Sequence, residues 1–416
     1  MLLTLGIFVG VVCAVLAMVM TPLGSKLLPG PVAEERIVEV PGEVPDPEVV
    51  IQERVVERRV EVPAEPPEMP DKPVSYKKID VATLFNGIQI KSELQSEAGG
   101  VASVEREVPE AFQAYFELRL KVPTPNQTIE QLAGCNEHLP NLLTDMGMLV
   151  DGAGVSKYFY HLYDLKQRQV QANVTRLEAA LSRHNFYDCD TVLELTHPET
   201  KQRAFFLQGE MDVVADGSDG DRMPEFPQEI AESSNFQATT SYGWKKLTKQ
   251  PNPLIEVLSA KLKKYEERYK VRGLTRGENA FLEGQIGMIP KVIEDLKYRS
   301  FLLAEEDPFV VIPMSTRRYL GRDPFIPKVG DYAVVIYGNK LYPAIVGDYG
   351  PTTKVGEASL RIAKELNSRA TPYRRPVSDL SVSYLVFPGS AEKPFGQPNL
   401  AKWHARCGEL LERMGG

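Results

Sequence analysis

The chain has 416 residues, of which 43% are hydrophobic and 25% charged, and its formal net charge is −8. A chain of this length can bury the core of one large domain or of two smaller ones. No basic patch with interleaved aromatic residues occurs along it. The composition therefore argues against a nucleic-acid-binding protein.

Residues 1–25 predict a membrane anchor. The run Leu2–Met20 contains no charged residue and is about as long as a helix that crosses the hydrocarbon core of a bilayer. A cleaved signal peptide is the alternative, although no basic residue precedes the run and only Leu23–Ser25 resembles a cleavage site. We expect an anchored protein, or a secreted one if the segment is cleaved, with the remaining chain outside the cytoplasm.

Residues 26–74 predict an extended stalk. Nine of the 44 residues from Pro31 to Val74 are proline, and 12 acidic against 5 basic residues give this segment a net charge of −7. Proline at this density excludes helix and regular sheet, and few aromatic residues are present to build a core. We expect a semi-rigid spacer, with a linker that has no spacing role as the alternative. From Ser75 onward 44 acidic and 42 basic residues nearly balance, so the acidic net charge says little about the folded part.

The cysteines and histidines do not indicate a metal site. Four cysteines and five histidines are present, with no Cys-x-x-Cys pair and no ligand spacing among the histidines. If the domain is exported, a disulfide between Cys135 and Cys189 is one expectation. Three buried thiols, those of Cys135, Cys189 and Cys407, are the other.

Hydrophobic periodicity in residues 75–416 predicts a mixture of strands and helices. Before residue 250 the patterns favour strands at Phe116–Val122, Thr191–Leu195 and Arg203–Val214, with a hairpin turn at His197–Thr200, and helices at Asn141–Val150 and Lys157–Arg183. After residue 300 they favour strands at Phe309–Pro313, Tyr332–Tyr337, Leu341–Val346 and Val382–Phe387, and a helix at Leu400–Met414.

Between these two parts, residues 253–299 predict an inserted helical hairpin. Each half has an apolar stripe at three- and four-residue steps, and Pro290 is expected to kink the second helix. We interpret the hairpin as structural and packed on the main domain. A coiled coil that binds a partner is the alternative.

Two carboxylates in the segment Gly347–Asn367 are candidate catalytic groups. Glu357 follows Gly356, where an amphipathic helix is expected to begin, and the first turn of a helix favours the anion that a general base needs. Asp348 follows an apolar strand, where partial burial would raise its pKa and suit a general acid. Hydrolysis of a glycosidic bond needs one protonated and one ionised carboxyl group. Both residue types are also common structural choices at such positions.

A second acidic cluster occupies residues 210–222. It resembles a calcium loop, but counting from Asp212 the third position is Val214 and the twelfth is Met223, where an EF-hand requires a carboxylate. The cluster therefore predicts a polar turn, or carboxylates that face a ligand.

Several blocks in one order resemble glycoside hydrolase family 75, the chitosanases, over about residues 205–414. The most specific is GDYGPTTKVGEASLRIAKELN, which carries Asp348 and Glu357. The others are Met211–Val213 with Asp216–Gly217, Ser241–Trp244 before Asn252–Leu254, Pro308–Pro313, and Ser381–Gly389. The chain departs from the family pattern at Val214, which replaces an acidic position, in the inserted hairpin, and in the anchor and stalk.

The resemblance implies an endo-acting hydrolase of β-1,4-linked glucosamine polymers that inverts configuration without a cofactor. The two essential carboxylates of the family fall on Asp348 and Glu357. Because chitosan carries ammonium groups, Asp212 and Asp216 are expected to bind substrate, and Tyr242 or Trp244 to stack on a sugar.

For the fold we expect an α+β domain with helices packed around a β-barrel-like core, and the folds of inverting polysaccharidases favour a double-psi type. Two other functions stay open. One is hydrolysis of another amino-sugar glycan such as peptidoglycan, and the other is non-catalytic binding of a glycan or partner at the surface.

Overall fold

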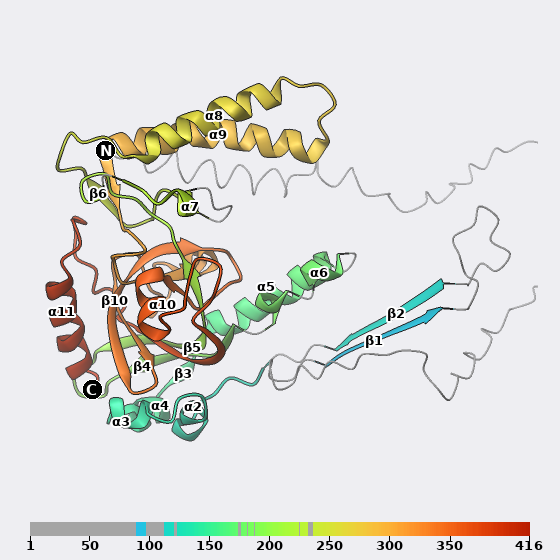
Figure 1. Cartoon of the computed structure of the whole chain (residues 1–416). Coiled ribbons are helices and arrows are strands. Elements are labelled where there is room, and N and C mark those ends of the chain that lie inside the picture. The colour runs from blue at the N-terminus through green and yellow to red at the C-terminus, as the bar shows by residue number, and fades with distance from the viewer. Residues whose placement is uncertain are drawn as a thin grey trace, which may run out of the picture. The chain divides into compact units, whose positions relative to one another are not determined.

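A computed structural model describes residues 89–96, 112–119 and 123–416, apart from 174–175, 181, 187, 224 and 232–235 (Figure 1). The membrane anchor expected at residues 1–25 and the stalk expected at residues 26–74 lie outside the described residues. No helix within the described part of the chain is both long enough and apolar enough to cross a membrane.

The described residues form an α+β fold. Its strands are β1 (Gln89–Ser96), β2 (Phe112–Arg119), β3 (Gly154–Val155), β4 (Cys189–Thr196), β5 (Arg203–Val214), β6 (Gly243–Lys245), β7 (Arg299–Phe301), β8 (Phe309–Pro313), β9 (Tyr332–Tyr337), β10 (Lys340–Gly350), β11 (Glu357–Ser359) and β12 (Val377–Val386). Its α-helices are α2 (Ile129–Cys135), α3 (Leu139–Leu142), α4 (Met146–Asp151), α5 (Lys157–Ala172), α6 (Leu177–Ala180), α7 (Gln228–Ala231), α8 (Leu254–Tyr269), α9 (Arg276–Tyr298), α10 (Leu360–Leu366) and α11 (Leu400–Glu412), with 3₁₀ turns η2 (Arg183–Asn185) and η3 (Met314–Tyr319).

Six strands close into a barrel in the order β11-β8-β10-β9-β12-β5, and β11 pairs in parallel with β5 to complete the ring. The first half of β5 also pairs with β4, which extends the sheet to β3. The hairpins β4–β5 and β9–β10 lie where the sequence predicts them. The expectation of an α+β domain with a barrel core is therefore confirmed.

Strand residues alternate between two cores, as the two-residue period of a strand requires. One core fills the barrel and receives side chains from all six strands, among them Ala358, Val310, Ala344, Ala333, Tyr384 and Leu207. The other core covers the outer surface of the barrel, where α11 packs through Trp403 and Cys407, and α2, α3 and α4 pack through Leu132, Leu139 and Met146. The catalytic candidates lie in strands that take part in both cores.

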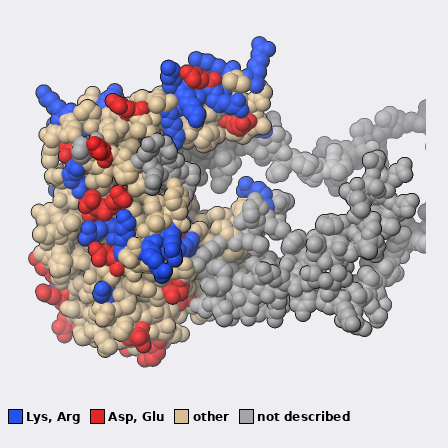
Figure 2. Space-filling view, in the orientation of Figure 1, with Lys and Arg blue, Asp and Glu red and all other residues tan. Residues whose placement is uncertain are grey.

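The inserted hairpin consists of α8 and α9, which pack mainly on each other. Only Leu254 of α8, and Leu282, Ile289 and Leu296 of α9, are buried. Leu254 and Leu296 join a small cluster with Ala238 and Phe301 that fixes the base of the hairpin to the domain. Figure 2 shows Lys and Arg side chains gathered over these helices, and exposed apolar side chains such as Phe281 and Met288 lie among the charged ones. Helix α9 continues through Pro290.

Three local expectations are corrected or narrowed by the structure. The single helix expected at 141–150 is two short helices, α3 and α4, and the helix expected at 157–183 ends at Ala172, with α6 and η2 after it. The disulfide between Cys135 and Cys189 does not form, because all three described cysteines are free thiols. Cys189 and Cys407 are buried, whereas Cys135 is partly exposed and hydrogen bonds with the carboxylate of Asp190.

A buried ion pair joins helix α5 to Asp188, just before β4, and both of its residues also hydrogen bond with the loop that precedes β11. The Nζ of Lys166 lies 2.8 Å from Oδ1 of Asp188, and both side chains are almost fully buried. Lys166 also donates to the carbonyl oxygens of His184 and Thr353, and Asp188 accepts from the backbone N–H of Val355. This pair therefore positions the backbone only a few residues before Glu357.

Replacing Lys166 with Met should destabilise the fold, because it leaves the buried carboxylate of Asp188 without a compensating charge. We expect the free energy of unfolding, measured by urea denaturation, to fall by about 3–5 kcal/mol. Lys297→Met is the matched control, since Lys297 forms an exposed pair with Glu294 within α9, and it should unfold like the wild type. Equal midpoints for the two variants would contradict a structural role for this pair.

Candidate active site

A bulge in β10 determines which way Asp348 points. Between Val346 and Asp348 strand β10 advances by two residues while its partner β8 advances by one, so Gly347 is an extra residue. Val346 belongs to the barrel interior, and regular alternation would point Asp348 inward as well. The bulge turns Asp348 to the outer face that Val311 shares. The carbonyl of Gly347 accepts a hydrogen bond from the N–H of Tyr242.

Glu357 lies in a strand rather than in the first turn of a helix, which corrects the expectation from the sequence. It begins β11, and α10 starts only at Leu360. Gly356 has a φ of 74°, and a Cβ there would collide with the carbonyl oxygen of Glu210, so only glycine suits this approach to β5. The helix macrodipole therefore does not explain how Glu357 could be kept ionised.

Asp348, Val311, Glu357 and Asp212 form one row across β10, β8, β11 and β5. Val311 of β8 pairs with Asp348 of β10 on one side and with Glu357 of β11 on the other. Glu357 in turn pairs with Asp212 of β5. Gly350 is two residues after Asp348, and a Cβ on it would contact Oε2 of Glu357 and lie 2.8 Å from Cγ1 of Val311. Since neighbouring strands lie about 4.8 Å apart, the Cα atoms of Asp348 and Glu357 are separated by roughly 10 Å.

Asp348 is held by neutral hydrogen-bond donors. Its Oδ1 accepts from the N–H of Ser241 at 2.9 Å, from the hydroxyl of Ser241 at 2.5 Å and from the N–H of Tyr349 at 2.7 Å. Burial raises the pKa of Asp348, and these donors oppose the rise. No ion pair joins Asp348 to a cation among the described side chains.

Glu357, in contrast, is paired with a cation. The Nζ of Lys354 lies 2.7 Å from Oε1 of Glu357 and 2.7 Å from Oδ2 of Asp212. Burial raises the pKa of Glu357, whose residue is only 4% exposed, and the charge of Lys354 acts in the opposite direction. Burial also disfavours the charged form of Lys354, but attraction to Glu357 and Asp212 prevails and raises the pKa of the lysine.

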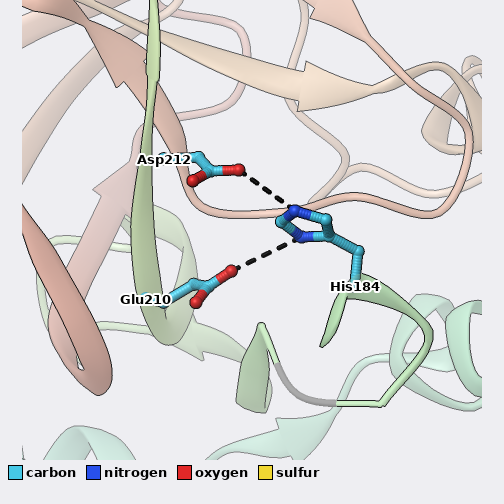
Figure 3. Close-up of side chains that lie close together, drawn as sticks. All are labelled: His184, Glu210 and Asp212. Atoms are coloured by element: carbon cyan, nitrogen blue, oxygen red, sulfur yellow. Dashed lines mark ion pairs between the residues drawn. The ribbon is translucent and has the colours of Figure 1, made fainter. Parts of the chain in front are cut away.

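Asp212 belongs to a network that extends to Glu210, which lies two residues earlier on the same face of β5. Arg375 lies 2.7 Å from Oε2 of Glu210 and 3.1 Å from Oδ1 of Asp212. His184 lies between the same two carboxylates (Figure 3), with Nδ1 3.5 Å from Glu210 and Nε2 3.3 Å from Asp212. Burial lowers the pKa of His184, and Asp212 opposes this most strongly.

His184, Glu210 and Asp212 are close enough together to be considered as metal ligands. The arrangement fits a network of ion pairs better. Arg375 and Lys354 already supply positive charge to both carboxylates, and His184 directs a different ring nitrogen at each of them, whereas a metal ligand would offer one nitrogen to a shared point.

Asp216 lies beyond the end of β5, close enough to Asp348 and Glu357 to be influenced by their charges. Its Oδ1 accepts from the N–H of Gln237 at 2.8 Å. Burial raises the pKa of Asp216 to about 7, the hydrogen bond from Gln237 opposes the rise, and the negative charges of Asp348 and Glu357 add to it. Asp216 is therefore the carboxyl group of this site best suited to carry a proton near neutral pH.

Tyr242 and Trp244 occupy a different environment from the one expected for sugar-stacking residues. They are 7% and 4% exposed and belong to the outer core. The ring of Tyr242 stacks on Phe395 at 4.3 Å, and the guanidinium of Arg222 lies 5.6 Å from the ring of Trp244. Their rings thus pack against protein, and their predicted contact with substrate stays a prediction.

Sequence reasoning missed Lys354, Arg375, His184, Glu210 and Ser241. Lys354 lies three residues before Glu357, but a lone lysine in a loop has no recognisable pattern. Arg375, His184 and Ser241 come from segments far away along the chain, and only the closure of the barrel brings them to β5 and β10, whereas Glu210 lies in β5 itself. Alternation along β5 could have placed Glu210 on the same face as Asp212.

No curated protein matches the chain. Residues 211–414, just under half of the chain, match the sequence model of a family described as fungal chitosanase of glycosyl hydrolase group 75, and the match contains all four predicted carboxylates. Residues 211–414 therefore resemble that family, and the match indicates a chitosanase-like glycoside hydrolase.

Proposed function

We propose that the protein cleaves β-1,4-linked glucosamine polymers within the chain, with inversion, using Asp348 as general acid and Glu357 as general base. The observation that carries the proposal is the row across the sheet, in which the two carboxylates flank Val311 from opposite sides. Inverting glycosidases separate their carboxyl groups by about 6.5–9.5 Å so that water fits between the sugar and the base. A Cα separation of roughly 10 Å, with both side chains on one face, is compatible with that range.

The different partners of the two carboxylates support the division of roles. Asp348 has hydrogen-bond donors at Oδ1 only, among the described residues, so its Oδ2 can carry the proton that the glycosidic oxygen receives. Glu357 is paired with Lys354, which favours the ionised form that a base needs to activate water. A raised pKa for the acid and an ion-paired base are what two-carboxylate catalysis requires.

Binding of a cationic polymer is assigned to the carboxylates around the pair. Asp216 has no cation in an ion pair among the described residues, so an ammonium group of the substrate would be its first cation and would favour its ionised form. Asp212 is already engaged by Lys354, Arg375 and His184.

Three finer expectations belong to the same proposal. They are the double-psi type of the barrel, the membrane anchor at residues 1–25 and the location of the catalytic domain outside the cytoplasm. The apolar run Leu2–Met20 supports the anchor.

Glu357→Gln and Asp348→Asn should each reduce hydrolysis of chitosan by the full-length protein at least about 100-fold, because each removes one half of the acid–base pair. The readout is the rate at which reducing ends appear, with the anomer of the first product determined by NMR. Glu365→Gln is the matched control, since Glu365 lies on α10 in a half-exposed pair with Arg361 and should keep wild-type activity.

The same measurement on chitin and peptidoglycan separates the alternatives. Turnover of peptidoglycan alone would replace the chitosan proposal with hydrolysis of another amino-sugar glycan. Equal rates for the wild type and Glu357→Gln on all three polymers would contradict an enzymatic role for this site.

Asp216→Asn should change how stability depends on pH. The pKa of Asp216 is 3.8 in the reference state and about 7 in the fold. As pH rises from about 4 to 7, the unfolded chain has lost this proton while the folded protein still holds it, so the wild type loses stability relative to the variant. We expect Asp216→Asn to gain roughly 3–4 kcal/mol on the wild type between pH 4 and pH 8 in urea unfolding. A difference that does not vary with pH would contradict this.

Gly350→Ala should impair catalysis more than folding. Its new methyl group would occupy the space of Oε2 of Glu357, so the carboxylate must move while the buried apolar surface is nearly unchanged. We expect at least a 10-fold lower kcat in the folded variant, with a modestly lower melting temperature because the methyl group also crowds Cγ1 of Val311. Gly338→Ala is a comparison at an open position with positive φ, and it should alter stability but not kcat at matched folding.

A further inference from the structure

Lys354 forms an ion pair with Glu357, the proposed base, and none with Asp348, the proposed acid, among the described side chains. It lies in the short loop between β10 and β11, and its Nζ is 2.7 Å from both Oε1 of Glu357 and Oδ2 of Asp212. Its side chain is 21% exposed, whereas that of Glu357 is 5% exposed. Among the side chains that the structure describes, Lys354 is the only cation in an ion pair with Glu357.

Asp212, the second carboxylate that binds Lys354, is itself held in place by other groups. Asp212 is held on its Oδ1 by Arg375, which also binds Glu210, and its backbone N–H donates to the carbonyl of Gly356 at 2.6 Å. Asp212 is therefore a rigid support. The ammonium group of Lys354 binds both Asp212 and Glu357 and therefore has little freedom to move. It holds the carboxylate of Glu357 in one orientation.

The remaining charged and titratable neighbours of Glu357 would not replace this effect. Asp212 and Asp188 are acidic and favour protonation of Glu357, and the negative charge of Glu357 in turn raises the pKa of Asp216. His184 and Arg375 face Asp212 and Glu210 rather than Glu357. Without Lys354, the ionised form of Glu357 would have no cation in an ion pair among the described side chains, while Asp212 and Asp188 would still favour its protonation.

We propose that Lys354 is a positioning residue for the reaction: it holds Glu357 ionised and oriented toward the attacking water, with Asp212 as the support that holds Lys354. The inference rests on the proposed function of Glu357 as general base. It gives Asp212 a role in supporting the base in place of a free subsite for substrate.

The pH dependence of kcat tests the proposal, because its acid limb reports the ionisation of the base in the enzyme–substrate complex. Lys354→Met removes the positive charge, so Glu357 should need a higher pH to ionise. We expect the acid limb to move upward by about one pH unit or more and kcat at the wild-type optimum to fall at least 10-fold, with KM changed much less. Lys354→Arg should restore part of the activity and most of the limb position.

Asp212→Asn should move the acid limb in the opposite direction. It removes a negative charge beside Glu357 and leaves the charge of Lys354 to act on Glu357 alone, so Glu357 should ionise at lower pH. A residue with a merely structural role would not produce shifts of opposite sign. Lys364→Met is the matched control, because Lys364 lies on α10 in a half-exposed pair with Glu305, and its pH profile should equal that of the wild type.

The outcomes are distinct. An unmoved acid limb in folded Lys354→Met overturns the inference. If that variant does not fold, as judged by circular dichroism, Asp212→Asn decides: a downward shift supports the proposal, and no shift or an upward shift overturns it. Glu357→Gln is measured alongside, and wild-type activity in that variant would overturn the proposed function itself rather than the role of Lys354.

Discussion

Charge compensation in the wall of the barrel is the interaction on which the site depends. Glu210, Asp212 and Glu357 are 0%, 8% and 4% exposed, and an unpaired charge at that depth costs several kcal/mol. The compensating charges of Lys354 and Arg375 come from loops outside the barrel strands, and each bridges two carboxylates. The loops before β11 and β12 are thereby held against β5. The same contacts that offset the cost of burial also orient the group that we propose to activate water.

Backbone geometry places the carboxylates before any side chain acts on them. Parallel pairing of β11 with β5 sets Glu357 beside Asp212, and antiparallel pairing with β8 sets it beside Val311. The bulge at Gly347 then moves Asp348 from the interior face to the outer one. Without the bulge, the two carboxylates would lie on opposite faces of the sheet and could not act on one glycosidic bond.

Local patterns predicted the elements with a strong periodic signal, among them the β4–β5 and β9–β10 hairpins and the two helices of the insertion. They failed at Glu357, where a glycine before an amphipathic stretch is typical of a helix start. The three-residue strand β11 is too short to show a period, and it exists because the edges of β5 and β8 supply its hydrogen bonds. The disulfide expected between Cys135 and Cys189 failed for a related reason, since spacing alone does not say where two thiols lie.

The sequence by itself determined the resemblance of residues 211–414 to a chitosanase family and pointed to Asp348 and Glu357 as the proposed catalytic pair, because an ordered set of short motifs is a property of the chain and needs no coordinates. Only the tertiary structure decided how those carboxylates differ. Hydrogen bonds from Ser241 hold Asp348, whereas Lys354 holds Glu357, and burial raises the pKa of their neighbour Asp216 to about 7. The physical reason is that the pKa of a buried group depends on which charges and donors lie within a few ångströms, and barrel closure brings those groups together from distant parts of the chain.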